Sequence, residues 1–216
     1  MKNINATLSD ITKSGVWGTI GPRMTEAGED VAAHAGAAHA LLVISKSAAV
    51  ETLLRALEIT FGDKVICIAN DDLCAEMSVS AVGAKPLICE NDNEVIEAIK
   101  KSGVKAIIAP STCDFETFAK LCRNSDIKLI EDAGNDIHLD TNENIYASFC
   151  DLSHITAPCG AVITNKTDAY CLAFSHHHCG HPVGEGEGIY HHALLGGDFR
   201  INEWQAAAIS HYIRGC

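Results

Sequence analysis

Four short polar segments directly follow apolar runs, and they are the first candidates for a ligand site: residues 45–47, 69–72, 110–114 and 132–135. If the apolar runs are strands of a parallel sheet, their carboxyl ends meet at one edge, where open α/β sheets bind ligands. Asp132 stands out because it is a carboxylate at the end of such a run. Two interpretations stay open for it, a ligand-binding acid or a cap of the following segment.

A second candidate is a group of soft metal ligands in the last quarter of the chain: His176, His177, His178, Cys179, His181, His191 and His192. Imidazole and thiolate side chains suit zinc and similar divalent ions. Adjacent histidines in a loop point in different directions, however, so this spacing does not define a tetrahedral site. We therefore predict a solvated loop over residues 176–197 and no metal site.

The elements that must position these residues alternate between apolar strands and amphipathic helices. Val50, Leu53, Leu54 and Leu57 recur at helical spacing, and near-continuous apolar runs indicate strands buried on both faces. We expect strands at 41–44, 65–69, 86–89, 104–109, 127–130 and 160–164, with another around Phe149. We expect helices at 50–57, 73–82, 94–102, 115–123 and 203–213. This alternation predicts an α/β fold with a mostly parallel sheet flanked by helices.

The composition narrows the class of protein. The chain has 216 residues, of which 47% are hydrophobic and 20% charged, with a formal net charge of -12. This length predicts a single domain, and the acidic charge excludes binding to nucleic acid and to anionic membranes. No apolar run reaches the ~20 residues of a membrane span, and the start of the chain lacks a secretion signal. We expect a cytoplasmic protein whose ten cysteines are mostly buried free thiols.

Six segments then resemble, in order and at nearly the right spacing, the DegT/DnrJ/StrS family of pyridoxal-phosphate (PLP) sugar aminotransferases. The resemblance covers about residues 11–213 and rests on residues 36–41, 62–66, 82–86, 129–133, 160–165 and 196–207. It implies the large domain of a fold type I aminotransferase, with residues 1–216 forming that domain alone. The smaller C-terminal domain of the family is absent from this sequence.

The resemblance places a serine where the family has its Schiff-base lysine. The family's Ser-Phe-x-x-x-Lys aligns with residues 148–153 and ends at Ser153, whose hydroxyl cannot form an imine. The next residue, His154, lies in a segment similar to the His-His-Ile-Thr motif of the family's PLP- or PMP-dependent sugar 3-dehydratases. In those enzymes a histidine is the base, so His154 is the alternative catalytic residue.

The same resemblance assigns the other parts of a cofactor site. Asp132 takes the position of the acid that holds the pyridinium nitrogen, and Ser45, Ser47 and Ser148 are the remaining phosphate donors. Asn135, just beyond Asp132, belongs with them. PLP or PMP is thus the cofactor that the family implies.

Several of these positions depart from the family pattern. Asp72 replaces the aromatic residue that stacks on the cofactor ring, and Lys46 replaces a glycine of the phosphate loop while adding a cation. Asp198 replaces an asparagine that reaches the phosphate in the partner subunit, and its charge should repel that anion. The substrate loop at 110–114 is also shortened. Losses spread along the chain indicate relaxed cofactor binding.

The function that follows is a degenerate aminotransferase homologue without lysine-dependent transamination. It would be a binding or partner subunit in nucleotide-sugar or related metabolism, with a sugar-nucleotide-like ligand. A homodimer, or a heterodimer with an intact paralogue, is expected. The alternative is a dehydratase-like enzyme that uses PMP or PLP with His154 as its base. A third interpretation is a decayed or split gene.

Overall fold

The computed structural model describes residues 4–18, 21–70, 72–100, 103–123, 125–183 and 194–215, and these contain one seven-stranded sheet. The strands are β1 (His39–Val43), β2 (Lys64–Ile68), β3 (Lys85–Cys89), β4 (Val104–Pro110), β5 (Lys128–Asp132), β6 (Ile145–Asp151) and β7 (Gly160–Thr164). The helices are α1 (Ile4–Ser14), α2 (Pro22–His34), α3 (Lys46–Ala56), α4 (Cys74–Ala81), α5 (Asp92–Ile99), α6 (Phe115–Cys122), α7 (Thr167–His177) and α8 (Glu203–Gly215).

The strand order is β1-β7-β6-β5-β4-β2-β3, and the pairs from β6 through β3 are all parallel. Only β7 is antiparallel to its neighbours, β1 and β6, among the strands described. Two antiparallel steps leave β1 pointing the same way as β6. The carboxyl ends of β1, β2 and β5 therefore meet at one edge of the sheet, which the sequence could only assume.

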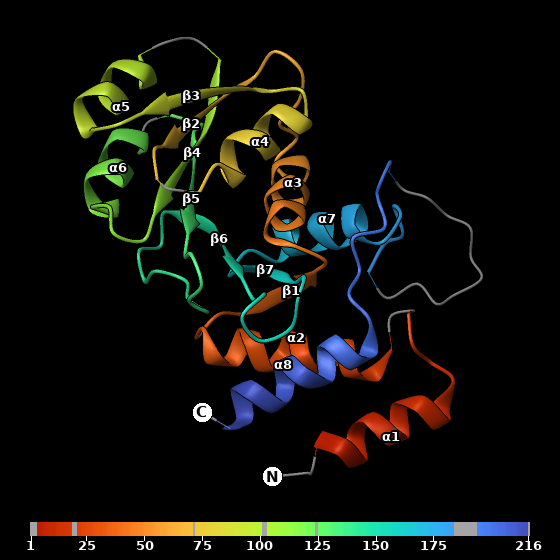
Figure 1. Ribbon diagram of the computed structural model, residues 1–216. Helices are drawn as coiled ribbons and strands as arrows, with labels where there is room; N and C mark the ends of the chain where they lie inside the picture. Colours follow the sequence, from red (N-terminus) through yellow and green to blue (C-terminus); the bar gives the residue numbers. More distant parts are fainter. Residues whose placement is uncertain are drawn as a thin grey trace.

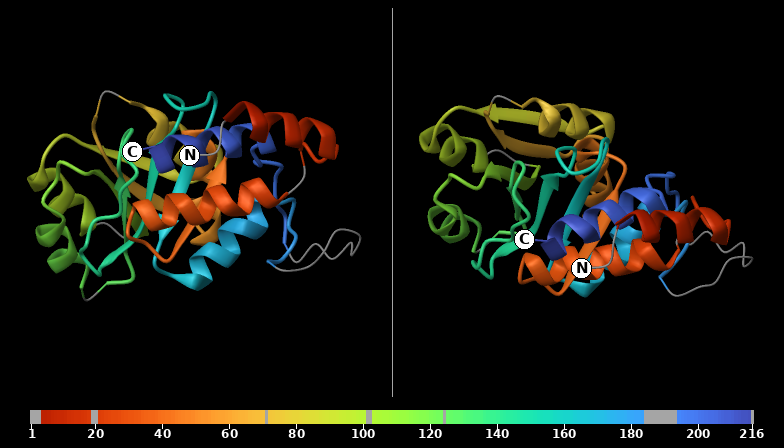
Figure 2. Two further views of the ribbon diagram at one scale, coloured as in Figure 1. Left: turned by 90° about the horizontal axis from the view of Figure 1, so that it is seen from below. Right: turned by 60° about the horizontal axis from the view of Figure 1, so that its bottom comes forward.

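Helices cover both faces of the sheet, as Figure 1 shows. One core cluster joins the sheet to α3 and α7 and includes Leu53, Leu54 and Ala173. The other joins it to α2, α5, α6 and α8 and includes Val31, Phe118 and Ile209. In Figure 2, α8 lies along α2 with α1 beside it, in agreement with the contacts between these helices. The mostly parallel α/β fold predicted from the apolar alternation is thus confirmed.

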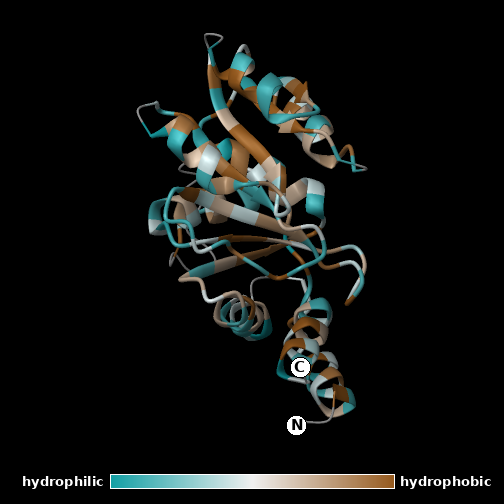
Figure 3. Ribbon diagram, turned by 90° about the vertical axis from the view of Figure 1, so that its left-hand side faces the viewer, coloured by the Kyte–Doolittle hydropathy of each residue, from teal (hydrophilic) through white to brown (hydrophobic). Residues whose placement is uncertain are grey.

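The apolar character of the strands explains this layering. Figure 3 shows largely brown, hydrophobic strands at the centre and helices that alternate between brown and teal faces. In β7, all five residues are buried, because helices lie over both of its faces. The described cysteines are free thiols, with Cys67, Cys89, Cys122 and Cys150 among the buried ones. Among the described residues, no helix combines the length and apolar character needed to cross a membrane.

The expected loop at 176–197 begins later than predicted, so that expectation was wrong at its start. His176 and His177 are the last two residues of α7, a helix that the sequence interpretation missed. Its apolar positions do not gather on one face, because it packs between α3, β1 and β7. His191 and His192 lie outside the described residues.

Candidate functional site

The centre of the candidate site is an ion pair that joins two distant parts of the chain. Lys46 Nζ lies 2.9 Å from Asp132 Oδ1 and 3.0 Å from Asp132 Oδ2. The same nitrogen lies 2.7 Å from Asp72 Oδ2. The side chains of Lys46 and Asp132 are only 10% and 4% exposed, whereas that of Asp72 is 50% exposed. One ammonium therefore bridges a buried and a half-exposed carboxylate.

The fold brings these groups together at the carboxyl edge of the sheet. Asp132 is the last residue of β5, Lys46 is the first residue of α3 after β1, and Asp72 precedes α4 after β2. The Ser45 hydroxyl caps α3 by accepting a 3.0 Å hydrogen bond from the Ala48 amide. A Cβ at Gly160 would lie 2.7 Å from backbone atoms of Ser45, so only glycine lets β7 approach the start of α3 this closely.

The charges in this group reinforce one another. Burial lowers the pKa of Lys46, but hydrogen bonds and charge from Asp72 and Asp132 outweigh it, so its pKa is raised overall. Burial raises the pKa of Asp72, and the hydrogen bonds from Lys46 and the Cys74 amide bring it below its usual value. Lys46 is therefore an ammonium at neutral pH and has no free amine for nucleophilic chemistry.

Neighbouring residues complete the surroundings of the ammonium. The Phe149 ring of β6 lies 5.5 Å from Lys46 Nζ, a cation–π distance. Asp132 also accepts hydrogen bonds from the Gly134 amide at 2.9 Å and from Asn70 Nδ2 at 3.4 Å. The Asp132 carboxylate is thus held by a cation and by two further donors.

The four other predicted cofactor residues are spread around this centre. Ser45 and Ser47 flank Lys46, and the Ser47 hydroxyl lies 3.3 Å from the Cys74 thiol. Ser148 is fully buried in β6, and its hydroxyl has no hydrogen-bond partner among the described residues. Its neighbours Ala147 and Phe149 pack on the α3 side, so strand alternation directs Ser148 to the opposite face. Asn135 is exposed in the turn after β5.

The two predicted catalytic residues lie in an exposed turn after β6. Ser153 and His154 are both exposed, and the Ser153 amide donates a 2.7 Å hydrogen bond to Asp151 Oδ1. The His154 ring packs edge-on against Tyr212 of α8, with 5.8 Å between ring centroids. Since α8 covers the face opposite α3, the structure does not join His154 to the group around Lys46.

Asp198 differs from its expected effect. Arg200 donates two hydrogen bonds to its carboxylate, from Nε at 2.7 Å and from Nη2 at 2.9 Å. The pKa of Asp198 is lowered mainly by these hydrogen bonds. Its negative charge is therefore compensated, and the predicted repulsion of an anion omitted Arg200. Within the described ranges, no group of three or more His, Cys, Asp or Glu side chains is arranged to hold a metal ion.

The residues present do not fit PLP or PMP in the family's manner. A pyridinium N–H needs the Asp132 carboxylate as its acceptor, and the Lys46 ammonium already binds both of its oxygens. Lys46 and Asp72 stand where the resemblance puts a glycine and a stacking aromatic side chain. The sequence interpretation recorded each change separately and missed that they are a matched pair. Their opposite charges at two positions of one site were the available signal.

The parallel sheet, its single antiparallel inner strand and the carboxylate at the end of β5 define a chain of the aminotransferase class. The chain belongs to the DegT/DnrJ/EryC1/StrS aminotransferase family, which it matches over residues 1–214.

Among curated relatives, it is 25% identical to the 3-amino-5-hydroxybenzoate synthase of Amycolatopsis mediterranei (strain S699), over 89% of this chain and 55% of that protein. It is 29% identical to the UDP-4-amino-4-deoxy-L-arabinose–oxoglutarate aminotransferase of Shewanella sediminis (strain HAW-EB3), over 60% of this chain and 36% of that protein. The chain thus spans about half, or less, of the length of these relatives.

Solved structures share the fold. The structure of NtdA from Bacillus subtilis with bound cofactor PMP superposes with a TM-score of 0.86 at 18% identity, over 98% of this chain and 52% of that one. The GDP-4-keto-6-deoxymannose-3-dehydratase ColD superposes with a TM-score of 0.80 at 17% identity, over 98% of this chain and 65% of that one.

Proposed function

We propose that this chain is a member of its family that has lost transaminase chemistry and acts as a binding or partner subunit. The observation that carries the proposal is the Lys46 ammonium on Asp132, 2.9 Å away. A cofactor that used Asp132 would first have to break this buried pair, at a cost of about 3 kcal/mol. That corresponds to more than a hundredfold in affinity.

The absence of a Schiff-base lysine supports the same conclusion. The family position carries Ser153, and Lys46 is held as an ammonium at the wrong end of the site, beside the carboxylate. The dehydratase alternative depends on His154, whose ring packs on Tyr212 instead. We therefore favour the subunit over the enzyme.

The relatives suggest what such a subunit would serve. Several act on nucleotide-linked sugars by their names, and one makes an aminohydroxybenzoate. We propose a cytoplasmic protein that pairs with itself or with an intact paralogue and takes a sugar-nucleotide-like ligand. In this proposal, residues 1–216 act as a large domain without the family's smaller C-terminal domain.

Equilibrium dialysis against PMP tests the central claim, because PMP has no aldehyde to react with surface lysines. The wild-type chain should show no saturable binding, whereas Lys46→Ala should bind PMP at least tenfold more tightly by freeing Asp132. Lys100→Ala is the control, since Lys100 forms an exposed pair with Glu97. Tight PMP binding by the wild type that Asp132→Asn abolishes would overturn the proposal.

A further inference from the structure

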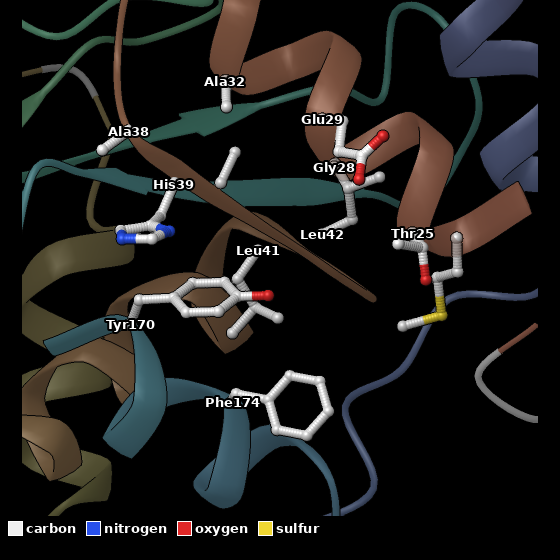
Figure 4. A pocket seen from close by; sticks show the side chains of 12 residues that line it. Thr25, Gly28, Glu29, Ala32, Ala38, His39, Leu41, Leu42, Tyr170 and Phe174 are labelled. Carbon is white, nitrogen blue, oxygen red and sulfur yellow. The ribbon is translucent and has the colours of Figure 1, made fainter. Parts of the chain in front are cut away.

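A second cavity, of about 300 Å³, lies away from the Lys46 site, between α2, the edge strand β1 and α7. Figure 4 shows its lining, with Thr25 and Glu29 from α2 facing Tyr170 and Phe174 from α7. No strand lies beyond β1 in the described sheet, so side chains from both of its faces reach the cavity. This volume matches the lower end of small-molecule sites.

The walls of this cavity are mostly apolar and aromatic. Leu41, Leu42 and Met24 contribute aliphatic surface. The Tyr170 and Phe174 rings lie 6.3 Å apart at 47°, and the His39 ring stacks on Tyr170 at 4.7 Å. These contacts hold Tyr170 in place, so the cavity offers an aromatic wall that needs little reorganisation on binding.

The polar groups of the cavity are oxygens and include one carboxylate. In Figure 4 the Glu29 carboxylate, the Thr25 hydroxyl and the Tyr170 hydroxyl all point toward the open space. Glu29 makes no ion pair printed by its geometry with any described Lys or Arg, and no Lys or Arg lines the cavity. Burial, with smaller effects of Cys171 and Glu29, raises the pKa of Tyr170, so its phenol stays protonated.

We propose that this cavity binds a small organic ammonium, with an aromatic or apolar body against Tyr170 and Phe174 and its charge on Glu29. The site supplies negative charge, acceptors and aromatic surface, so the ligand has to bring the cation and the N–H donors. The net charge of -12 favours the approach of a cation. This inference does not depend on the state of the Lys46 site.

The probes are 2-phenylethylammonium and its neutral counterpart 2-phenylethanol, titrated into the isotopically labelled chain and followed by NMR. The ammonium should bind with a dissociation constant of about 1 mM or tighter, and shift changes should gather on α2 and α7. The alcohol should bind about tenfold more weakly, because it lacks the charge-assisted hydrogen bond to Glu29.

Two variants locate the site without altering the core. Glu29→Gln should weaken the ammonium about tenfold and leave the alcohol unchanged, and Thr25→Phe should block both probes from the exposed rim. Glu116→Gln, on the distant α6, should change neither affinity. The proposal is overturned if the ammonium shows no saturable binding by ~10 mM, if both probes bind equally, or if Glu29→Gln has no effect.

Discussion

Lys46 and Asp132 are 86 positions apart in the chain, yet the Lys46 ammonium contacts both oxygens of the Asp132 carboxylate, at 2.9 and 3.0 Å. Asp72 holds the same ammonium from its exposed side. An internal cation thus neutralises the carboxylate that the family's architecture offers to a cofactor. The two residues form a closed unit, and the predictions below begin with its energetics.

Lys46→Met keeps the length of the side chain and removes its charge, which leaves Asp132 buried without a counter-ion. The free energy of unfolding should fall by about 3 kcal/mol, measured by urea denaturation. The double variant with Asp132→Asn should recover at least 1 kcal/mol of that loss, because it removes the orphaned charge. Lys100→Met should cost less than about 0.5 kcal/mol, since that pair is exposed. Equal losses for both lysines would contradict the prediction.

Gly160→Ala should destabilise the start of α3. The new methyl group would lie 2.7 Å from the backbone of Ser45 and 2.8 Å from the Lys46 amide, and backbone cannot move aside cheaply. We expect a loss of about 2–3 kcal/mol by thermal or chemical unfolding. Gly18→Ala is the matched control, because no atom lies within 4 Å of its Cβ position. The explanation fails if the two substitutions cost the same.

Glu203 is 2% exposed and closes the N-terminus of α2 from the other end of the chain. Its carboxylate accepts hydrogen bonds from the Arg23 and Met24 amides, both at 3.0 Å. Glu203→Ala should therefore cost about 2 kcal/mol, as a lost helix cap with two charge-assisted hydrogen bonds. Glu203→Gln should cost less, since one amide oxygen remains. Hydrogen exchange at the first turn of α2 would report the loss directly, and unchanged protection in Glu203→Ala would refute it.

His177 should make the fold sensitive to acid. It is fully buried, and burial is the largest cause that lowers its pKa from 6.5 to about 4. Below pH 6.5 the unfolded chain binds a proton that the folded chain refuses, so stability falls as pH falls from about 6.5 toward 4. Between pH 7 and pH 5 this contribution is about 2 kcal/mol.

Urea unfolding of the wild type and of His177→Gln at these two pH values measures that contribution. The variant lacks the titrating ring, so its deficit relative to the wild type should shrink by about 2 kcal/mol at pH 5. His34→Gln, at the exposed end of α2, should leave the pH dependence unchanged. Parallel pH profiles for the wild type and His177→Gln would exclude His177 as the source.

Much of the fold could be predicted from the sequence because its signals are local. Apolar runs such as residues 104–109 and turn glycines such as Gly62 and Gly83, both with positive φ, mark the strands and the turns between them. Helix α7 was missed because it is buried on several sides and lacks one apolar face. Helices α1 and α2 were missed as well.

The sequence by itself determined the α/β alternation, the place of Asp132 at a strand end, and the loss of the lysine at Ser153. The tertiary structure alone decided that Lys46 binds Asp132 and that Glu203 caps α2. It also placed His154 on Tyr212, away from the Lys46 group. The physical reason is that ion pairs and caps act over about 3 Å, and only the order of strands and the packing of helices bring such distant residues that close.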